Sequence, residues 1–299
     1  MEDGRQSPIK NGDFPLKPPA RRRFGSGIAI TVCLLIALGP VVFLGLRPEI
    51  ARWYVAAAME HDLLDELEAA EADLDKAIEW DPEDGDLYVR RADIRLQQKD
   101  FPGAMDDCQV ALQSNGQDFR PALLRRMLVH QRQRHHEKAI AESDLLVEAS
   151  KAASERAESL NARAYARALG NVQITEGLED IQAAFDALGT EDNAAFLDTR
   201  GYLYYLNGDF DEALRDMERA VQMAEDERSS FVMKRPELQK QSRVDERLLD
   251  RQARRINENL AVLYQHRGLV YEALDRPEEA EADFERADKY GYSPEDGVW

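Results

Sequence analysis

The chain has 299 residues, of which 32% are charged, and its formal net charge at pH 7 is −19. Its two cysteines, Cys33 and Cys108, are too few for a disulfide framework, and both are predicted to be buried as small apolar side chains. A chain this acidic is expected to repel nucleic acid and anionic lipid and to favour basic partners.

Residues 1–27 are polar and rich in proline, with three consecutive arginines from Arg21 to Arg23. They contain six basic and three acidic residues, so the rest of the chain carries a net charge of −22. A segment with so few apolar residues cannot bury a core of its own. It is therefore predicted to be a disordered basic tail.

Residues 28–46 contain no charged side chain and are mostly Ile, Val, Leu and Ala. As a helix this stretch rises about 28 Å, which is enough to cross a hydrocarbon core of about 30 Å. Arg47 and Pro48 end it. It is predicted to be an uncleaved transmembrane helix, a signal anchor. The competing interpretation is a cleaved signal peptide, whose apolar region would be shorter, at about 7–15 residues.

Basic residues are concentrated before the apolar stretch, where six lie, whereas Arg47 and Arg52 are the basic residues that closely follow it. Basic flanks of a membrane helix tend to stay in the cytoplasm. The sequence therefore predicts a single-pass membrane protein with a cytoplasmic N-terminal tail. The large part that follows the span is expected outside the cytoplasm.

The segment 201–220, GYLYYLNGDFDEALRDMERA, has apolar or small residues at helical spacing on both sides of Asn207-Gly208. Gly208 can adopt the left-handed conformation that ends a helix, and Asp209 can cap the next one. The small residues Gly201 and Ala213 let two backbones approach closely. The pattern predicts two short antiparallel helices joined by a tight turn.

Further copies of this pattern have apolar and small residues at matching positions, such as Tyr54, Ala58, Ala70, Leu74, Ala77 and Pro82 in the first. The pattern resembles the tetratricopeptide repeat, whose period is 34 residues. Six copies are predicted, at 51–84, 85–118, 120–153, 157–192, 194–227 and 261–294. The third is degenerate and the fourth has one extra residue between its helices. The resemblance implies an all-α fold over 51–294, a solenoid of helical hairpins wound as a right-handed superhelix, with 295–299 as a short tail.

The segment 228–260 interrupts the series and is rich in Arg, Glu, Lys and Gln. Its apolar residues, among them Leu238, Leu248 and Ile256, fall close to one helical face, and Pro236 stands at a plausible helix start. One long amphipathic helix that runs into the last repeat is predicted. It either lengthens the stack or offers a surface to a partner helix or a second copy.

The sequence contains no phosphate-binding glycine loop, nucleophile elbow or paired-cysteine metal spacing. Its only histidine cluster, His130, His135 and His136, falls at a predicted turn and a packing position, and the spacing supplies no further metal ligand. No catalysis, no cofactor and no metal site are therefore predicted.

In the tetratricopeptide repeat family, the first helices of the pairs line a groove that typically holds an extended peptide or a partner helix. The residues at matching positions are Arg90 and Asp93 in the second copy, Asn161 and Tyr165 in the fourth, and Asp198, Tyr202 and Tyr205 in the fifth. The Lys/Asn pattern by which chaperone-binding members hold a terminal carboxylate is missing. The tyrosines are either ligand anchors or packing residues between repeats.

These features together predict a membrane-anchored scaffold that binds another protein or a peptide segment, basic in character, without catalysis of its own. The alternative is an organelle import or assembly receptor with the same layout. In that case the repeats face the cytosol and an acidic groove binds basic targeting segments. The two hypotheses differ in the side of the membrane on which the repeats lie.

Overall fold

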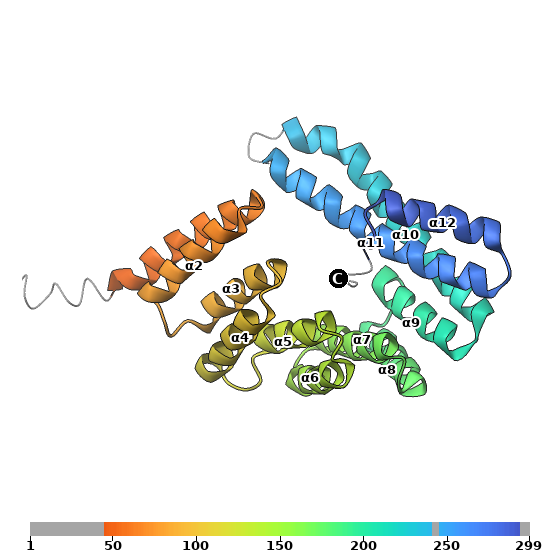
Figure 1. Ribbon diagram of the computed structural model, residues 1–299, viewed down its shortest axis with the longest axis horizontal. Coiled ribbons are helices and arrows are strands. Elements are labelled where there is room, and N and C mark those ends of the chain that lie inside the picture. The colour runs from red at the N-terminus through yellow and green to blue at the C-terminus, as the bar shows by residue number, and fades with distance from the viewer. Residues whose placement is uncertain (1–44, 241–244, 294–299) are drawn as a thin grey trace, which may run out of the picture. The chain divides into compact units, whose positions relative to one another are not determined.

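The computed structural model describes residues 45–240 and 245–293, and all regular elements within these ranges are helices (Figure 1). The predicted tails 1–27 and 295–299 lie outside the described residues. So does the predicted membrane helix 28–46, apart from its last two residues. Among the described residues no helix is both long enough and apolar enough to cross a bilayer. The helices belong to a compact unit that begins at Pro48, except for the first residues of the first helix.

The first helix covers residues 45–63. It is followed by α2 (Leu67–Trp80), α3 (Gly85–Gln97), α4 (Phe101–Asn115), α5 (Arg120–Arg132), α6 (His136–Ala149), α7 (Ala153–Gly170), α8 (Ile174–Leu188), α9 (Ala194–Asn207), α10 (Phe210–Lys240), α11 (Glu246–Ala273) and α12 (Pro277–Lys289). Consecutive helices pack as hairpins, and each hairpin packs on the next along the chain. The described part of the chain is thus a helical solenoid.

The small residues that the repeat pattern singles out are buried between the helices. They include Ala70, Ala77, Ala92, Ala104, Ala111 and Ala213, each with no exposed surface. Cys108 is also fully buried, as predicted, and burial raises the pKa of its thiol to about 12. Gly201 allows the close approach expected of it, because a Cβ there would lie 3.3 Å from the carbonyl oxygen of Ala213. Small side chains therefore set the distance between the paired helices.

A residue with positive φ ends the first helix of every hairpin. These residues are Asp65, Lys99, Arg134, Asn171, Gly208 and Asp275. For most side chains the left-handed conformation costs about 1–2 kcal/mol, whereas glycine adopts it freely. Gly208, with φ of 90°, is the only glycine in this set. The other five turns keep their shape because the hairpins packed around them impose it.

Lys99→Gly and Arg134→Gly are therefore expected to stabilise the protein by about 0.5–1 kcal/mol each, since they remove this strain at exposed sites. Asn171→Gly should gain less, because asparagine tolerates the left-handed conformation. Urea denaturation of the three variants measures the difference. A loss of stability in Lys99→Gly and Arg134→Gly would contradict this account of the turns.

The segment 228–260 differs from the single long helix predicted for it. Helix α10 of the fifth repeat continues into the insertion without a break and ends at Lys240, so Pro236 lies inside a helix. A second helix, α11, begins after the N-cap Asp245, whose carboxylate accepts a hydrogen bond from the backbone N–H of Arg247. The helical pattern of the fifth repeat extends past residue 227 with no residue to stop it, and the chain then turns back. The insertion therefore lengthens two antiparallel helices instead of one.

The buried face of α11 agrees with the predicted face at Ile256 and Leu260 and differs at one position, where Leu249 is buried in place of Leu248. Leu249, Ile256 and Leu260 are buried, whereas Leu248 is 51% exposed. Together with Val232 and Met233 on α10, Leu248 is an exposed apolar side chain of the extended hairpin. The predicted choice of Leu248 as a core residue was wrong because two leucines stand side by side in the sequence.

Candidate functional site

Five hairpins contain the same ion pair between their two helices. In each, an arginine of the first helix binds a buried carboxylate that follows 16 or 17 residues later in the second helix. The pairs are Arg91–Asp107, Arg126–Glu142, Arg163–Asp180, Arg200–Asp216 and Arg267–Asp283, with N–O distances of 2.5 to 2.7 Å. These carboxylates hold hairpins together and are not available to a ligand.

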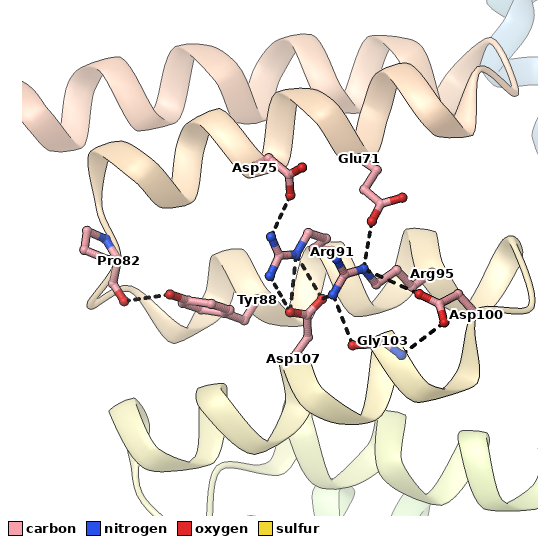
Figure 2. Close-up of polar contacts among 9 residues, drawn as sticks. All are labelled: Glu71, Asp75, Pro82, Tyr88, Arg91, Arg95, Asp100, Gly103 and Asp107. Carbon is pink, nitrogen blue, oxygen red and sulfur yellow. Dashed lines mark hydrogen bonds and ion pairs between the residues drawn. The ribbon is translucent and has the colours of Figure 1, made fainter.

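Figure 2 shows how the pair in the second hairpin also joins it to the first. The Arg91 guanidinium donates to Asp107 at 2.6 Å and to Asp75 of α2 at 2.6 Å. Arg95 repeats the arrangement one turn later, with Asp107 at 2.9 Å and Glu71 of α2 at 2.8 Å. Burial alone would lower the pKa of Arg91, but its hydrogen bonds to the two aspartates raise that pKa above its ordinary value. Asp107 is thus the centre of a network that links α2, α3 and α4.

A cavity of about 100 Å³ lies between the helix 45–63 and α3 and contains two of the predicted groove residues. We call it the N-terminal pocket. It is lined by Val55, Ala58, Met59, Asp62, Leu74, Arg90, Asp93, Ile94 and Gln97. Its floor is apolar, and Met59 on its rim is 59% exposed. The resemblance to the tetratricopeptide repeat implied that Arg90 and Asp93 lie on the groove side of α3, and the structure puts both at this pocket.

The two carboxylates of the N-terminal pocket are both engaged in bidentate ion pairs. Asp93 accepts from Nε and Nη2 of Arg125, at 2.7 and 2.8 Å. Asp62 accepts from Nη1 and Nη2 of Arg251, at 2.7 and 2.9 Å. Burial would raise the pKa of Asp62, but the hydrogen bonds from Arg251 and Gln97 lower it below its ordinary value. Each of the two carboxylates is therefore paired with an adjacent guanidinium.

Arg90 differs from the other charged groups of the pocket. Its side chain is exposed and forms no ion pair with any residue in the described ranges. Asp86 lies one turn earlier on the same helix and is also exposed. An exposed pair at this spacing contributes about 0.3–0.5 kcal/mol at most, so it does not fix the guanidinium. The pocket thus combines an apolar floor with one uncompensated positive charge.

The predicted groove residues of the fifth repeat form a different arrangement. Asp198 has no exposed surface and lies 2.9 Å from Nδ1 of His266, which is 4% exposed. The imidazole stacks on Tyr202, with ring centroids 4.5 Å apart, and Tyr202 in turn stacks on Tyr205 at 6.0 Å. The Tyr202 ring is therefore packed against two neighbouring rings. Asp198 and Tyr202 therefore join α9 to α11. For Tyr202 this corresponds to the second of the two predicted roles, a packing residue between repeats.

The two candidates on α7 have little accessible surface. Tyr165 is 4% exposed, and Asn161 is partly buried with a side-chain oxygen that has no hydrogen-bond partner among the described residues. Of the seven predicted groove residues, Arg90 and Asp93 meet at a described cavity. The other five lie on α7 and α9, mostly as packing residues.

A larger cavity, of about 420 Å³, lies where α9, α10 and α11 meet. Asn193, Met223, Glu227, Ile256 and Asn259 are among its lining residues. Sequence reasoning missed it because it depends on the return of the chain in the α10–α11 hairpin.

The three histidines of the predicted cluster, His130, His135 and His136, do not combine into a site. His135 precedes α6, and its ring centroid lies 5.9 Å from that of His130. Within the described ranges no group of three or more His, Cys, Asp or Glu side chains is arranged to hold a metal ion.

Comparison with protein families identifies three of the hairpins. One model of the tetratricopeptide repeat matches residues 194–227, and a second model of the same repeat matches 51–84 and 261–290. The chain therefore carries tetratricopeptide repeats, as the sequence pattern predicted. Such repeats bind other proteins or peptides as scaffolds and typically have no catalytic activity of their own.

Solved structures show the same fold. A tetratricopeptide repeat protein from Parabacteroides merdae is 18% identical, with a TM-score of 0.52, over 83% of this chain and 95% of that one. PilF from Pseudomonas aeruginosa is 15% identical, with a TM-score of 0.55, over 83% and 96%. A chain of the APC/C Cut9–Hcn1 hetero-tetramer is 14% identical, with a TM-score of 0.51, over 87% and 45%. No curated protein matches the chain.

Proposed function

We propose that this protein is a membrane-anchored scaffold that binds a segment of another protein along the first helices of its hairpins. The observation that carries the proposal is the N-terminal pocket, an apolar cavity with an exposed methionine and a free guanidinium on its rim. A groove that combines apolar surface with a few polar groups is suited to a peptide. Elsewhere along the described hairpins, buried ion pairs use the carboxylates for structure.

The net charge of −22 beyond the tail supports a partner chain that is basic overall. Such a field acts mainly on the rate of encounter, because exposed charges are screened within about 8 Å at physiological salt. It does not determine which group enters a particular pocket. The sequence predicted a basic ligand in the groove because of Asp93 and Asp198. In the structure Asp93 is neutralised by Arg125 and Asp198 is buried. The basic character therefore concerns the partner as a whole.

Site-specific photocrosslinking in the source cell tests the scaffold function. A photoreactive phenylalanine derivative replaces Met59 at the pocket and, as a matched control, the exposed Glu148 on α6. We expect an adduct with one discrete partner from position 59 and none from position 148. Equal adducts from both positions, or none from position 59, would contradict binding in this groove.

The membrane part of the proposal is supported by the uncharged stretch 28–46 and by the basic residues that precede it. With the repeats outside the cytoplasm, a reporter fused after residue 299 that works only in the cytoplasm should be silent. An active reporter would reverse the orientation. It would then favour the alternative function of a receptor with cytosolic repeats that binds basic targeting segments.

A further inference from the structure

We propose that the N-terminal pocket binds an acidic and apolar element of the partner, namely an aliphatic side chain next to an Asp or Glu carboxylate. The inference rests on the proposed function and specifies the chemistry that this one pocket selects. It differs from the expectation that the net charge alone gives, which is a basic ligand in an acidic groove.

The shape of the pocket requires the apolar half of this element. Val55, Ala58, Leu74 and Ile94 contribute the apolar lining, and the cavity holds about 100 Å³. Apolar cavities of about 150 Å³ bind a molecule of the size of benzene. This one is therefore large enough for a single aliphatic side chain and too small for a helix. Met59 on the rim adds a flexible apolar contact that adapts to the shape of the entering group.

The charges around the pocket require the acidic half. A basic ligand would have to compete with Arg125 for Asp93 or with Arg251 for Asp62, and each of those pairs already has two hydrogen bonds of 2.9 Å or less. An acidic ligand displaces nothing, because the Arg90 guanidinium has no ion pair with a described residue. Arginine binds a carboxylate through two parallel hydrogen bonds, which fixes the geometry as well as the charge.

A second cavity extends this surface toward α11. It holds about 320 Å³ and shares Met59 and Asp62 with the N-terminal pocket. Its other lining residues include Leu63 and Leu248, which are apolar, and Arg247, whose charge is paired with Asp245. The two cavities adjoin at Met59 and Asp62, and the lining of the second one also contains the charged side chains of Glu60 and Arg251. An extended segment that inserts its aliphatic side chain beside Arg90 therefore has further apolar surface for the neighbouring residue.

The test selects binders from a displayed library of random 12-residue peptides on the full-length protein. The same selection is made on Arg90→Glu, on Met59→Gln, and on the control Arg156→Glu. Arg156 is an exposed arginine of α7 with no ion pair among the described residues. Circular dichroism checks that all variants are folded, which is expected because the three side chains are exposed.

On the wild-type protein and on Arg156→Glu we expect enrichment of peptides with Asp or Glu next to Leu, Ile or Met. On Arg90→Glu the acidic residue should be replaced by Lys or Arg. The acidic peptide that binds best to the wild-type protein should bind the variant Arg90→Gln about tenfold more weakly. A version of this peptide with Asn or Gln in place of its Asp or Glu should bind Arg90→Gln as well as the acidic peptide does. Peptides that depend on Met59 are those enriched on the wild-type protein but not on Met59→Gln. If these peptides are basic, or are enriched equally on Arg90→Glu, this inference fails and the scaffold function stands. If no enrichment depends on Met59, both fail.

Discussion

Asp107→Ala should lower the free energy of unfolding of the affected repeats by about 3–5 kcal/mol, because it removes the buried carboxylate that the partly buried guanidiniums of Arg91 and Arg95 share. Asp107 is 2% exposed and accepts hydrogen bonds from both Arg91 and Arg95. Each arginine also binds a carboxylate of α2, so the loss affects the contact between the first two hairpins as well. Urea denaturation followed by circular dichroism measures the change.

The neighbouring residue supplies a matched control. Asp106 has the same side chain but is exposed, so Asp106→Ala should change the free energy of unfolding by less than about 0.5 kcal/mol. Because the hairpins mainly contact their neighbours, with the Asp62–Arg251 pair between the first helix and α11 as an exception, the damage from Asp107→Ala should also be local. Hydrogen exchange should accelerate in α2, α3 and α4 and stay unchanged in α12. Equal acceleration along the whole chain would contradict the modular arrangement.

The hairpins themselves could be predicted from the sequence because their determinants are local. Helical spacing, a turn residue such as Gly208 and small residues such as Gly201 and Ala213 each act within about twenty residues of one another. The structure confirms Gly208 in the left-handed conformation and Ala213 as fully buried. Where no breaker marked the boundary, as between α10 and the insertion, the same reasoning placed the helix ends wrongly. The predicted membrane helix 28–46 lies mostly outside the described residues and stays a prediction.

The groove was harder to predict because the state of a charge depends on its neighbours in space. The family resemblance implied that Asp93 lies on the groove side of α3 but did not show that Arg125, 32 residues later, neutralises it. The ion pairs within the hairpins were detectable in principle. Arg91 and Asp107 have the same spacing of 16 residues as Arg200 and Asp216, and both pairs occupy the same repeat positions.

The pair that joins the last two repeats was beyond such reasoning. Asp198 and His266 are 68 residues apart, and the insertion of the α10–α11 hairpin separates them in the sequence. Only the return of the chain through α11 brings the imidazole onto α9, where it meets both Asp198 and the ring of Tyr202.

Asp198→Ala is expected to cost about 1–3 kcal/mol in the free energy of unfolding, because it leaves the buried imidazole of His266 without its hydrogen-bond partner. The double variant Asp198→Leu with His266→Phe should recover most of this loss. It replaces the polar pair by apolar side chains of similar size, and the phenyl ring keeps the stack on Tyr202.

Chemical denaturation of the two variants and the wild-type protein measures both effects. The comparison separates two roles of this cluster. If the pair acts only as a structural joint between α9 and α11, the double variant should also bind the selected peptides with wild-type affinity. A double variant that is stable but has lost peptide binding would place Asp198 and His266 in the binding groove, and would return the fifth repeat to the candidate site. A single variant that loses less than about 1 kcal/mol would show that the imidazole finds water or another partner, and that stacking on Tyr202 holds the two helices together.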